Sequence, residues 1–313
     1  MSSERPKRGA LRRVLRWVPV ATLVVTAVAL WMLALGGGTA GVVAWNFFPL
    51  LVPLLGACFL IGTLVHAARK RRWKSPAVRS TLAGSLLALA SLLLFTSFPV
   101  AYPASLERTG PAATVRLPAD VPLRVGNGGD DIRTNLHAAV PDQRWAYDLA
   151  VDPMPAGSAR LQDYGCYGIP VVAPASGVVT GAHEGEPDAR PGVLSNNSRA
   201  PAGNYVSIRL DSTGTHLLIA HLQPGSVAVK AGARVREGEV IGRCGNSGNT
   251  TEPHIHVHHQ REDPATVSDL LAEGLPLYFR DHDGEPMPAG GFEVRGGVEV
   301  PTGAIVRHLG AKS

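Results

Sequence analysis

The sequence predicts three transmembrane α-helices followed by a compact all-β domain. Three long stretches near the N-terminus, residues 17–35, 41–65 and 80–102, contain no charged residue. Each is close to or longer than the roughly 20 apolar residues that cross a bilayer core as a helix. Beyond residue 120, short apolar runs alternate with Gly, Pro, Asn and Asp, a pattern typical of strands joined by turns. Buried core helices of a soluble protein are the alternative, whereas a secretory signal has only one short apolar region.

The basic residues beside these stretches predict their orientation. Residues 1–16 form a basic N-terminus, and a second basic segment separates the second stretch from the third. The two segments contain Arg5, Lys7, Arg8, Arg12, Arg13, Arg16, Arg69, Lys70, Arg71, Arg72, Lys74 and Arg79. The connection at 36–40 carries no charge. Because Lys and Arg are enriched in cytoplasmic loops, we expect both segments in the cytoplasm and everything after residue 102 outside. The chain is then a multi-pass protein of the cell membrane, with the lipid bilayer as a partner.

The formal net charge of +5 follows from this topology. Twelve of the 30 basic residues lie in the two basic segments, but only one of the 25 acidic residues precedes Arg79. The remaining 18 basic and 24 acidic residues give the rest of the chain a charge of −6. A nucleic-acid-binding domain concentrates positive charge on its own surface, so we expect no nucleic-acid partner.

The part beyond the third stretch divides into a linker, a domain and an extension. Residues 103–119 are rich in Pro, Ala and Thr without apolar periodicity, and residues 281–313 are rich in Gly. Between them, residues 120–280 form the predicted β domain, with a long polar loop at 188–203 and one helical run at 266–273. The spacing of its short apolar runs favours an all-β fold. The expected strands are 169–172, 177–180, 205–210, 216–222, 227–229, 239–243 and 254–259.

Three cysteines are too few for a disulfide scaffold. Cys58 lies in the second apolar stretch, whereas Cys166 and Cys244 lie in the part expected outside the cytoplasm, where disulfides persist. One bridge between Cys166 and Cys244 is an option, and two free thiols are the alternative.

Ten of the eleven histidines lie beyond the apolar stretches. The run EPHIHVHH places His254 and His256 two residues apart, so that in a strand both imidazoles point to one face. His221 ends the run LLIAHL, and Asp148 lies within WAYDLAV. Imidazole is a common zinc ligand and general base, and a buried carboxylate needs a partner such as a metal. Taken alone, each residue is more often a surface or locally hydrogen-bonded side chain, and spacing does not show that they converge.

Several motifs in a fixed order resemble the lysostaphin-type (LytM-type) zinc endopeptidases. They are YGIPVVAPASGVV, GNYVSIRL and LLIAHLQPGSVAVKAGARVREGEVIGRCGNSGNTTEPHIHV, within a resemblance that runs from about Asn135 to Val257. The resemblance implies a small, mostly antiparallel β domain with its site in a groove. It does not cover the apolar stretches.

By position in these motifs, the resemblance implies a role for four residues. His256, the second His of PHIH, and Asp148 of YDL correspond to zinc ligands. His254, the first His of PHIH, and His221 of AHL correspond to catalytic histidines beside the metal. His258 continues the same strand face, and we interpret it as an ordinary strand residue.

The third zinc ligand departs from the commonest pattern of the family. That pattern has a His four residues before the Asp, where this chain has Arg144. The nearest upstream histidine is His137, and its segment N-x-H followed by QRWAYD resembles a branch of the family with longer spacing. We therefore assign His137 as the third ligand, with His183 and Asp142 as the alternatives.

The resemblance implies a zinc metalloendopeptidase with one Zn²⁺ per domain. Substrates in the family are chiefly peptides of bacterial peptidoglycan, which an exported and membrane-tethered domain would meet. A non-catalytic module of the same fold that binds or regulates an envelope partner is the first alternative. A zinc-sensing or signalling membrane protein is the second, since three helices exceed what a simple tether needs; the sequence does not identify a protein partner for them.

Overall fold

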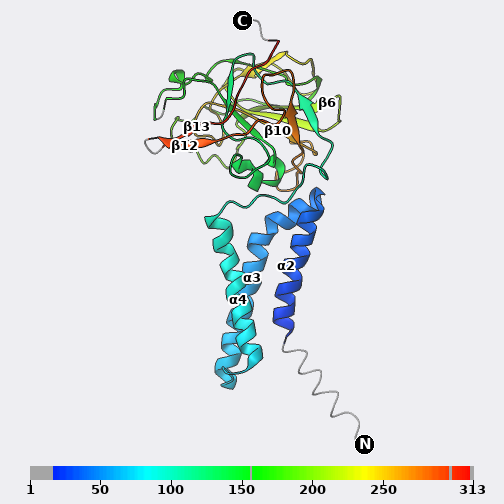
Figure 1. Cartoon of the computed structure of the whole chain (residues 1–313), viewed down its shortest axis with the longest axis vertical. Coiled ribbons are helices and arrows are strands. Elements are labelled where there is room, and N and C mark those ends of the chain that lie inside the picture. The colour runs from blue at the N-terminus through cyan, green and yellow to red at the C-terminus, as the bar shows by residue number, and fades with distance from the viewer. Residues whose placement is uncertain (1–16, 156, 296–297, 311–313) are drawn as a thin grey trace, which may run out of the picture. The chain divides into compact units, whose positions relative to one another are not determined.

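The computed structural model describes residues 17–155, 157–295 and 298–310 of the 313-residue chain (Figure 1). The basic N-terminus predicted at 1–16 lies outside the described residues. The chain divides into two compact units, Met1–Pro103 and Ala104–Ser313.

In its described residues, 17–103, the first unit contains three helices joined by short connections (Figure 1). They are α2 (Val18–Gly36), α3 (Gly38–Lys70) and α4 (Pro76–Ser97). Each is long and apolar enough to cross a membrane by length and composition. Pro19 stands in the first turn of α2, where a missing N–H costs no helical hydrogen bond.

The helices differ in their bounds from the charge-free stretches of the sequence. α3 includes the basic residues Arg69 and Lys70, because a helix end can extend beyond the apolar segment into polar surroundings. α4 begins at Pro76 and ends at Ser97, not at 80 and 102, because Pro99 follows closely and disfavours helical geometry before it. Pro49 and Pro53 lie inside α3, as membrane helices tolerate.

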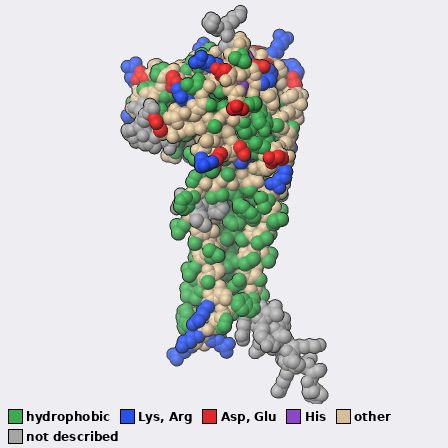
Figure 2. All heavy atoms as spheres, in the orientation of Figure 1, with side chains coloured by type: hydrophobic (Ala, Val, Ile, Leu, Met, Phe, Trp, Pro, Cys, Tyr) green, Lys and Arg blue, Asp and Glu red, His purple; other side chains and the backbone are tan. Residues whose placement is uncertain are grey.

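The side chains of the helical unit are distributed as a lipid environment requires. Large apolar residues face outward, among them Val25, Leu50 and Leu87, which are 65%, 65% and 74% exposed. Figure 2 shows these apolar side chains along the helices and basic side chains gathered at one end. Because soluble monomers rarely expose an apolar surface of this extent, the surface supports the predicted transmembrane role.

The second unit is built on one antiparallel sheet of eight strands, in the order β14-β2-β3-β10-β7-β6-β5-β8. The mostly antiparallel β domain expected from the sequence is therefore present. The strands are β2 (Leu123–Val125), β3 (Tyr147–Ala150), β5 (Gly177–His183), β6 (Asn204–Leu210), β7 (His216–Leu222), β8 (Arg234–Val235), β10 (Ile255–Gln260) and β14 (Ile305–Val306).

Three two-stranded sheets and short 3₁₀ helices complete the unit. The paired strands are β1 (Ala113–Val115) with β11 (Leu277–Phe279), β4 (Pro170–Val172) with β9 (Val240–Arg243), and β12 (Phe292–Arg295) with β13 (Val298–Pro301). The 3₁₀ helices are η1 (Leu136–Ala139), η2 (Pro141–Gln143) and η3 (Leu161–Asp163).

Alternation along the central strands separates the core from the site. Tyr147 and Leu149 of β3 are fully buried in the apolar core, as are Ile255 and Val257 of β10. Because successive side chains in a strand point to opposite faces, the residues between them point to the other face. That face carries Asp148 and His256.

Four features of the β unit differ from the sequence-based expectation. The run 266–273 is not helical but a series of turns, since its Leu270 and Leu271 are exposed and give a helix no face to bury. The run 227–229 forms no strand, because it contributes a single backbone bond, Ala228 N to Ile241 O, beside β9.

The ends of the β unit also extend beyond the expected domain. Strand β1 lies within the expected linker 103–119 and pairs in parallel with β11. Strand β14 lies within the expected extension 281–313 and pairs with β2 in the central sheet. Both pairings join segments far apart in sequence, which periodicity within a short window does not reveal.

Candidate metal and catalytic site

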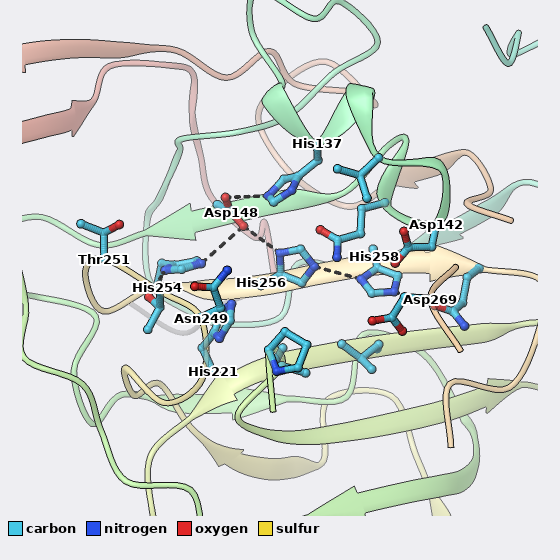
Figure 3. A pocket seen from close by; sticks show the side chains of 18 of the residues that line it. His137, Asp142, Asp148, His221, Asn249, Thr251, His254, His256, His258 and Asp269 are labelled. Carbon is cyan, nitrogen blue, oxygen red and sulfur yellow. Dashed lines mark hydrogen bonds and ion pairs between the residues drawn. The ribbon is translucent and has the colours of Figure 1, made fainter. Parts of the chain in front are cut away.

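The register of three adjacent strands brings the site together. On β10, His256 lies opposite Asp148 of β3 and Ala220 of β7. Directly opposed residues of antiparallel strands have neighbouring side chains on the same face. Figure 3 shows the resulting cluster, in which the imidazoles of His137, His254 and His256 surround the Asp148 carboxylate.

Asp148 is the hub of this cluster. Its Oδ2 lies 2.8 Å from His137 Nε2, and its Oδ1 lies 2.8 Å from His256 Nδ1 and 3.4 Å from His254 Nε2. Burial raises the pKa of Asp148, but the charges and hydrogen bonds of His137 and His254 outweigh it and hold that pKa well below its usual value. Asp148 is therefore an ionised carboxylate at neutral pH.

His137 is aimed at Asp148 by two asparagines. The side chain of Asn135 caps η1 and accepts a hydrogen bond from the backbone N–H of His137 at 3.2 Å. Asn127 donates to Asp148 Oδ2 at 2.7 Å and accepts from the backbone N–H of Leu136 at 2.9 Å. These bonds bring His137 to the carboxylate despite its eleven-residue distance in sequence.

The position four residues before Asp148 does not reach the site. Arg144 pairs with Asp130 at 2.9 Å, donates to the Asp130 carbonyl oxygen at 2.9 Å and lies over the Trp145 ring. This side chain therefore binds the loop before η1, and the imidazole of His137 lies beside Asp148 instead.

His221 enters the site through a break in strand geometry. Strict alternation would direct it away from the face that carries Ala220, but its φ is +60°, which a non-glycine residue seldom adopts. The register between β6 and β7 shifts at the same place, as in a β-bulge, which re-aims a side chain. The imidazole consequently lines the site, with its centroid 4.8 Å from that of His254.

His221 and His254 are held in the same manner. His221 Nδ1 lies 2.8 Å from the carbonyl oxygen of Ser247, and His254 Nδ1 lies 2.7 Å from that of Glu252. A carbonyl oxygen only accepts, so in each ring Nδ1 carries the proton and donates. In a neutral ring this leaves the lone pair on Nε2.

The pKa values of these two histidines move in opposite directions. Burial, followed by the neighbouring imidazoles, holds the pKa of His221 well below its ordinary value. Burial also opposes protonation of His254, but the Asp148 carboxylate outweighs it and raises the pKa of His254. At neutral pH the metal-free site therefore favours a neutral His221 and a protonated His254.

Among the described residues, two groups have the composition and spacing of metal sites. They are His137, Asp148 and His256, and His221, His254 and His256, with the ligand atoms of each group within 4.8 Å of one another. The first group contains a carboxylate, whose negative charge favours a cation. The structure thus brings together all five residues named from the sequence.

The two alternative ligands, His183 and Asp142, belong to neither metal group. His183 is close to Glu186 at 3.4 Å and stacks on Tyr205. Asp142 of η2 lines the same hollow as the site but belongs to neither metal group. Burial, with the charge of Asp269, raises the pKa of Asp142 to about 7.

His258 lies in strand β10 and belongs to neither metal group, but it is bonded to the site residue His256. His258 is 4% exposed and its Nδ1 lies 2.9 Å from His256 Nε2, while its Nε2 lies 2.8 Å from Gln260 Oε1. The two-residue period of His256, His258 and Gln260 was the available signal. Asn135 is the first residue of the N-x-H segment, whereas Asn127 lies outside every quoted motif and reaches Asp148 only through the fold.

Two hollows meet at the site. The first, of about 430 Å³, is lined by all five residues of the site and extends to Asp142 and Asp269. The second, of about 420 Å³, shares Asp148 and His254 with the first and reaches Phe292 and Pro301 of the β12–β13 hairpin. The site is therefore accessible from two directions.

A protein-family model matches a segment of the chain that includes three of the five site residues. Residues 162–267 match the model of peptidase family M23. This match supports the assignment of these residues to peptidase family M23. The matched segment contains His221, His254 and His256, whereas His137 and Asp148 lie upstream of it.

Individual relatives cover only part of the chain. A segment of 77 residues is 36% identical to the peptidoglycan DD-endopeptidase ShyC of Vibrio cholerae, which covers 23% of this chain and 17% of that protein. The chain thus spans less than a fifth of the length of this curated relative.

Solved structures are also similar to this chain over part of its length. Lysostaphin from Staphylococcus simulans aligns with a TM-score of 0.32 and 19% identity, over 49% of this chain and 47% of that one. A zinc-containing peptidase from Vibrio cholerae aligns with a TM-score of 0.29 and 22% identity, over 46% of this chain and 37% of that one.

Proposed function

We propose that the chain is a membrane-anchored, extracytoplasmic zinc metalloendopeptidase that cleaves peptides of peptidoglycan. The observation that carries the proposal is the convergence of His137, His254 and His256 on the Asp148 carboxylate, with His221 beside them in the same hollow. The family M23 match and the peptidoglycan endopeptidase similarity supply the reaction class and the substrate class.

His137, Asp148 and His256 would hold the metal. Two imidazole nitrogens and one carboxylate oxygen are ligands that Zn²⁺ accepts, and three protein ligands leave a position open for water, as in catalytic sites. When bound, zinc would lower the pKa of water to about 7 and polarise the scissile carbonyl. We assign this site to the longer-spaced N-x-H branch of the family because Arg144 is bound elsewhere.

His221 would act as the general base. Its Nδ1–H is directed to Ser247, so its Nε2 lone pair is available to take a proton from the attacking water. Its lowered pKa keeps the ring neutral at neutral pH. The proton can then pass to the departing amine, which returns His221 to its neutral form.

His254 would stabilise the charge that develops on the substrate. In the metal-free site the Asp148 carboxylate outweighs burial and raises the pKa of His254. In its imidazolium form the ring would donate from Nε2–H to the oxygen of the tetrahedral intermediate. Asp148 offsets the charge of that ring at 3.4 Å. The two histidines thus divide acid and base work.

The two hollows support cleavage within a peptide rather than at its end. A site closed on one side would accept only a chain terminus, but two hollows that share Asp148 and His254 would give room for substrate residues on both sides of the scissile bond. This arrangement is expected for an endopeptidase.

The full chain in detergent tests the proposal. Purified protein should contain about one zinc and should release peptides from peptidoglycan, identified by mass spectrometry. A His221→Ala variant that retains zinc but releases no peptide is the control for a contaminating hydrolase. A zinc-loaded wild-type chain that binds peptidoglycan without cleaving it would instead indicate a binding module.

Topology is tested separately. A reporter that is active only in the cytoplasm should be silent when fused after residue 310 and active when inserted in the 71–75 connection. Activity of the C-terminal fusion would contradict the proposed extracytoplasmic domain.

A further inference from the structure

A hydrogen-bonded row of side chains continues from the site along β10. His256, His258 and Gln260 follow one another at two-residue spacing on one face of the strand and are 4%, 4% and 1% exposed. His256 Nε2 lies 2.9 Å from His258 Nδ1, and His258 Nε2 lies 2.8 Å from Gln260 Oε1. Gln260 Nε2 then donates to the Glu262 carbonyl oxygen at 2.8 Å.

The far end of the row sets the direction of every bond in it. A carbonyl oxygen accepts only, so the Gln260 amide must present its NH₂ to Glu262 and its oxygen to His258. That oxygen in turn requires a proton on His258 Nε2. A neutral imidazole carries one proton, so His258 Nδ1 is an acceptor and His256 Nε2 must donate to it.

The last bond leaves His256 with its lone pair on Nδ1. This nitrogen lies 2.8 Å from Asp148 Oδ1, an ionised oxygen that also only accepts. Two acceptors at this distance repel each other unless a cation binds both. The hydrogen bonds of this row therefore leave the Nδ1 lone pair of His256 available to bind a cation beside Asp148.

We propose that His258 and Gln260 are positioning residues that fix the tautomer of His256, so that Nδ1 is its metal-binding nitrogen before the metal arrives. The inference rests on the metal site of the function proposed above. Hydrogen-bond partners of this kind set ring orientation and ligand basicity in metal sites, and their loss commonly lowers metal affinity about 10- to 100-fold.

Zinc affinity of the full chain in detergent, measured by competition with a chromophoric chelator, tests the proposal. His258→Leu should weaken zinc binding about 10- to 100-fold, because His256 loses the acceptor that holds its Nε2–H. His258→Gln should restore most of the affinity, since its amide can accept from His256 and donate to Gln260.

His259→Leu is the matched control on the same strand. His259 is equally buried at 1% exposure, but its nitrogens face Thr215 and the Pro276 carbonyl oxygen and not His256. Its replacement should leave zinc affinity unchanged. A purely structural role of His258 predicts instead equal losses in His258→Leu and His258→Gln, and that result would overturn the proposal.

Two further measurements are independent of catalysis, and the second also needs no variant. The Co²⁺-substituted chain should show an altered visible spectrum in His258→Leu and a nearly wild-type spectrum in His258→Gln. In the metal-free wild type, ¹⁵N NMR should show the proton of His256 on Nε2; a proton on Nδ1 would refute the inference. A chain that binds zinc as described but cleaves no peptide would overturn the proposed function alone.

Discussion

The sheet and the loops supply the site in different ways. Asp148, His221 and His256 stand on three neighbouring strands; the ladder sets Asp148 opposite His256, and a register shift between β6 and β7 directs His221 to them. His137 stands on the short 3₁₀ helix η1, and His254 precedes β10 in a loop. The strand residues cannot shift without breaking backbone pairs, whereas the loop residues depend on a few side-chain and carbonyl contacts. Distant substitutions should therefore disturb His137 and His254 first.

The largest losses of zinc and activity should follow replacement of site residues that lie on strands. Asp148→Asn removes the charge that all three surrounding imidazoles share, so zinc and peptide cleavage should be lost together, with activity at least about 10³-fold lower. His221→Ala should lower activity to a similar extent but keep about one zinc bound, because it removes a base and not a ligand. Metal analysis beside the peptidoglycan assay separates the two variants.

Replacement of a site residue that lies outside the strands should reduce zinc binding and activity less completely. His137→Ala should lower zinc affinity by about 10²-fold or more and activity with it, since one of three ligands is lost while Asp148 and His256 remain. The matched control is His183→Ala, whose imidazole pairs with Glu186 away from the site. Unchanged zinc affinity in His137→Ala would show that another group is the third ligand.

A disulfide supports the loop that holds His221. Cys166 and Cys244 form a bridge across a separation of 78 residues, which resolves the alternative left open by the sequence. Cys166→Ser should lower the free energy of unfolding by about 4 kcal/mol on the chain-entropy model. Zinc affinity should change little, because Ser247 is also held by Asn204 N at 2.9 Å and Leu222 O at 2.7 Å.

The control for the disulfide is Cys58→Ser, which alters the free thiol of α3. It should leave stability unchanged. Alkylation of the unreduced chain followed by mass analysis should label one cysteine. Labelling of all three would contradict the bridge.

A smaller, pH-dependent effect on the stability of the β unit is expected at Asp142, which lines the first hollow. Burial raises the folded-state pKa of Asp142 to about 7 from an ordinary value of 3.8, so ionisation opposes folding as the pH rises from about 4 through 7. In the metal-free chain, Asp142→Asn should therefore stabilise the β unit above pH 7, by at most about 4 kcal/mol. Below pH 4 the two proteins should have equal stability.

Urea unfolding of both proteins at pH 4 and pH 8, followed by hydrogen exchange in the β unit, measures this difference. The same stability difference at both pH values would contradict a raised pKa of Asp142. Such a result would leave the geometry of the metal group untouched, because Asp142 belongs to neither group.

The site illustrates which features short-range sequence patterns can predict. The expected strand 254–259 places His256 on a strand, as β10 (Ile255–Gln260) confirms, but His254 lies in the loop just before that strand. The direction of His221 could not be predicted, because strand alternation points it to the wrong face and only its φ of +60° turns it inward. His137 was assigned by resemblance, and the asparagine contacts that aim it are visible only in the fold.

The sequence by itself determined the elements: three apolar segments with basic ends, a set of short strands, and histidines at their ends. These features are local, since hydropathy and two-residue alternation act over neighbouring residues. Only the tertiary structure decided that the elements converge. His256 and Asp148 are 108 residues apart in sequence yet 2.8 Å apart in space, because the β3–β10 register sets them opposite each other. Which nitrogen of His256 faces Asp148 follows from hydrogen bonds that likewise exist only once the strand is in place.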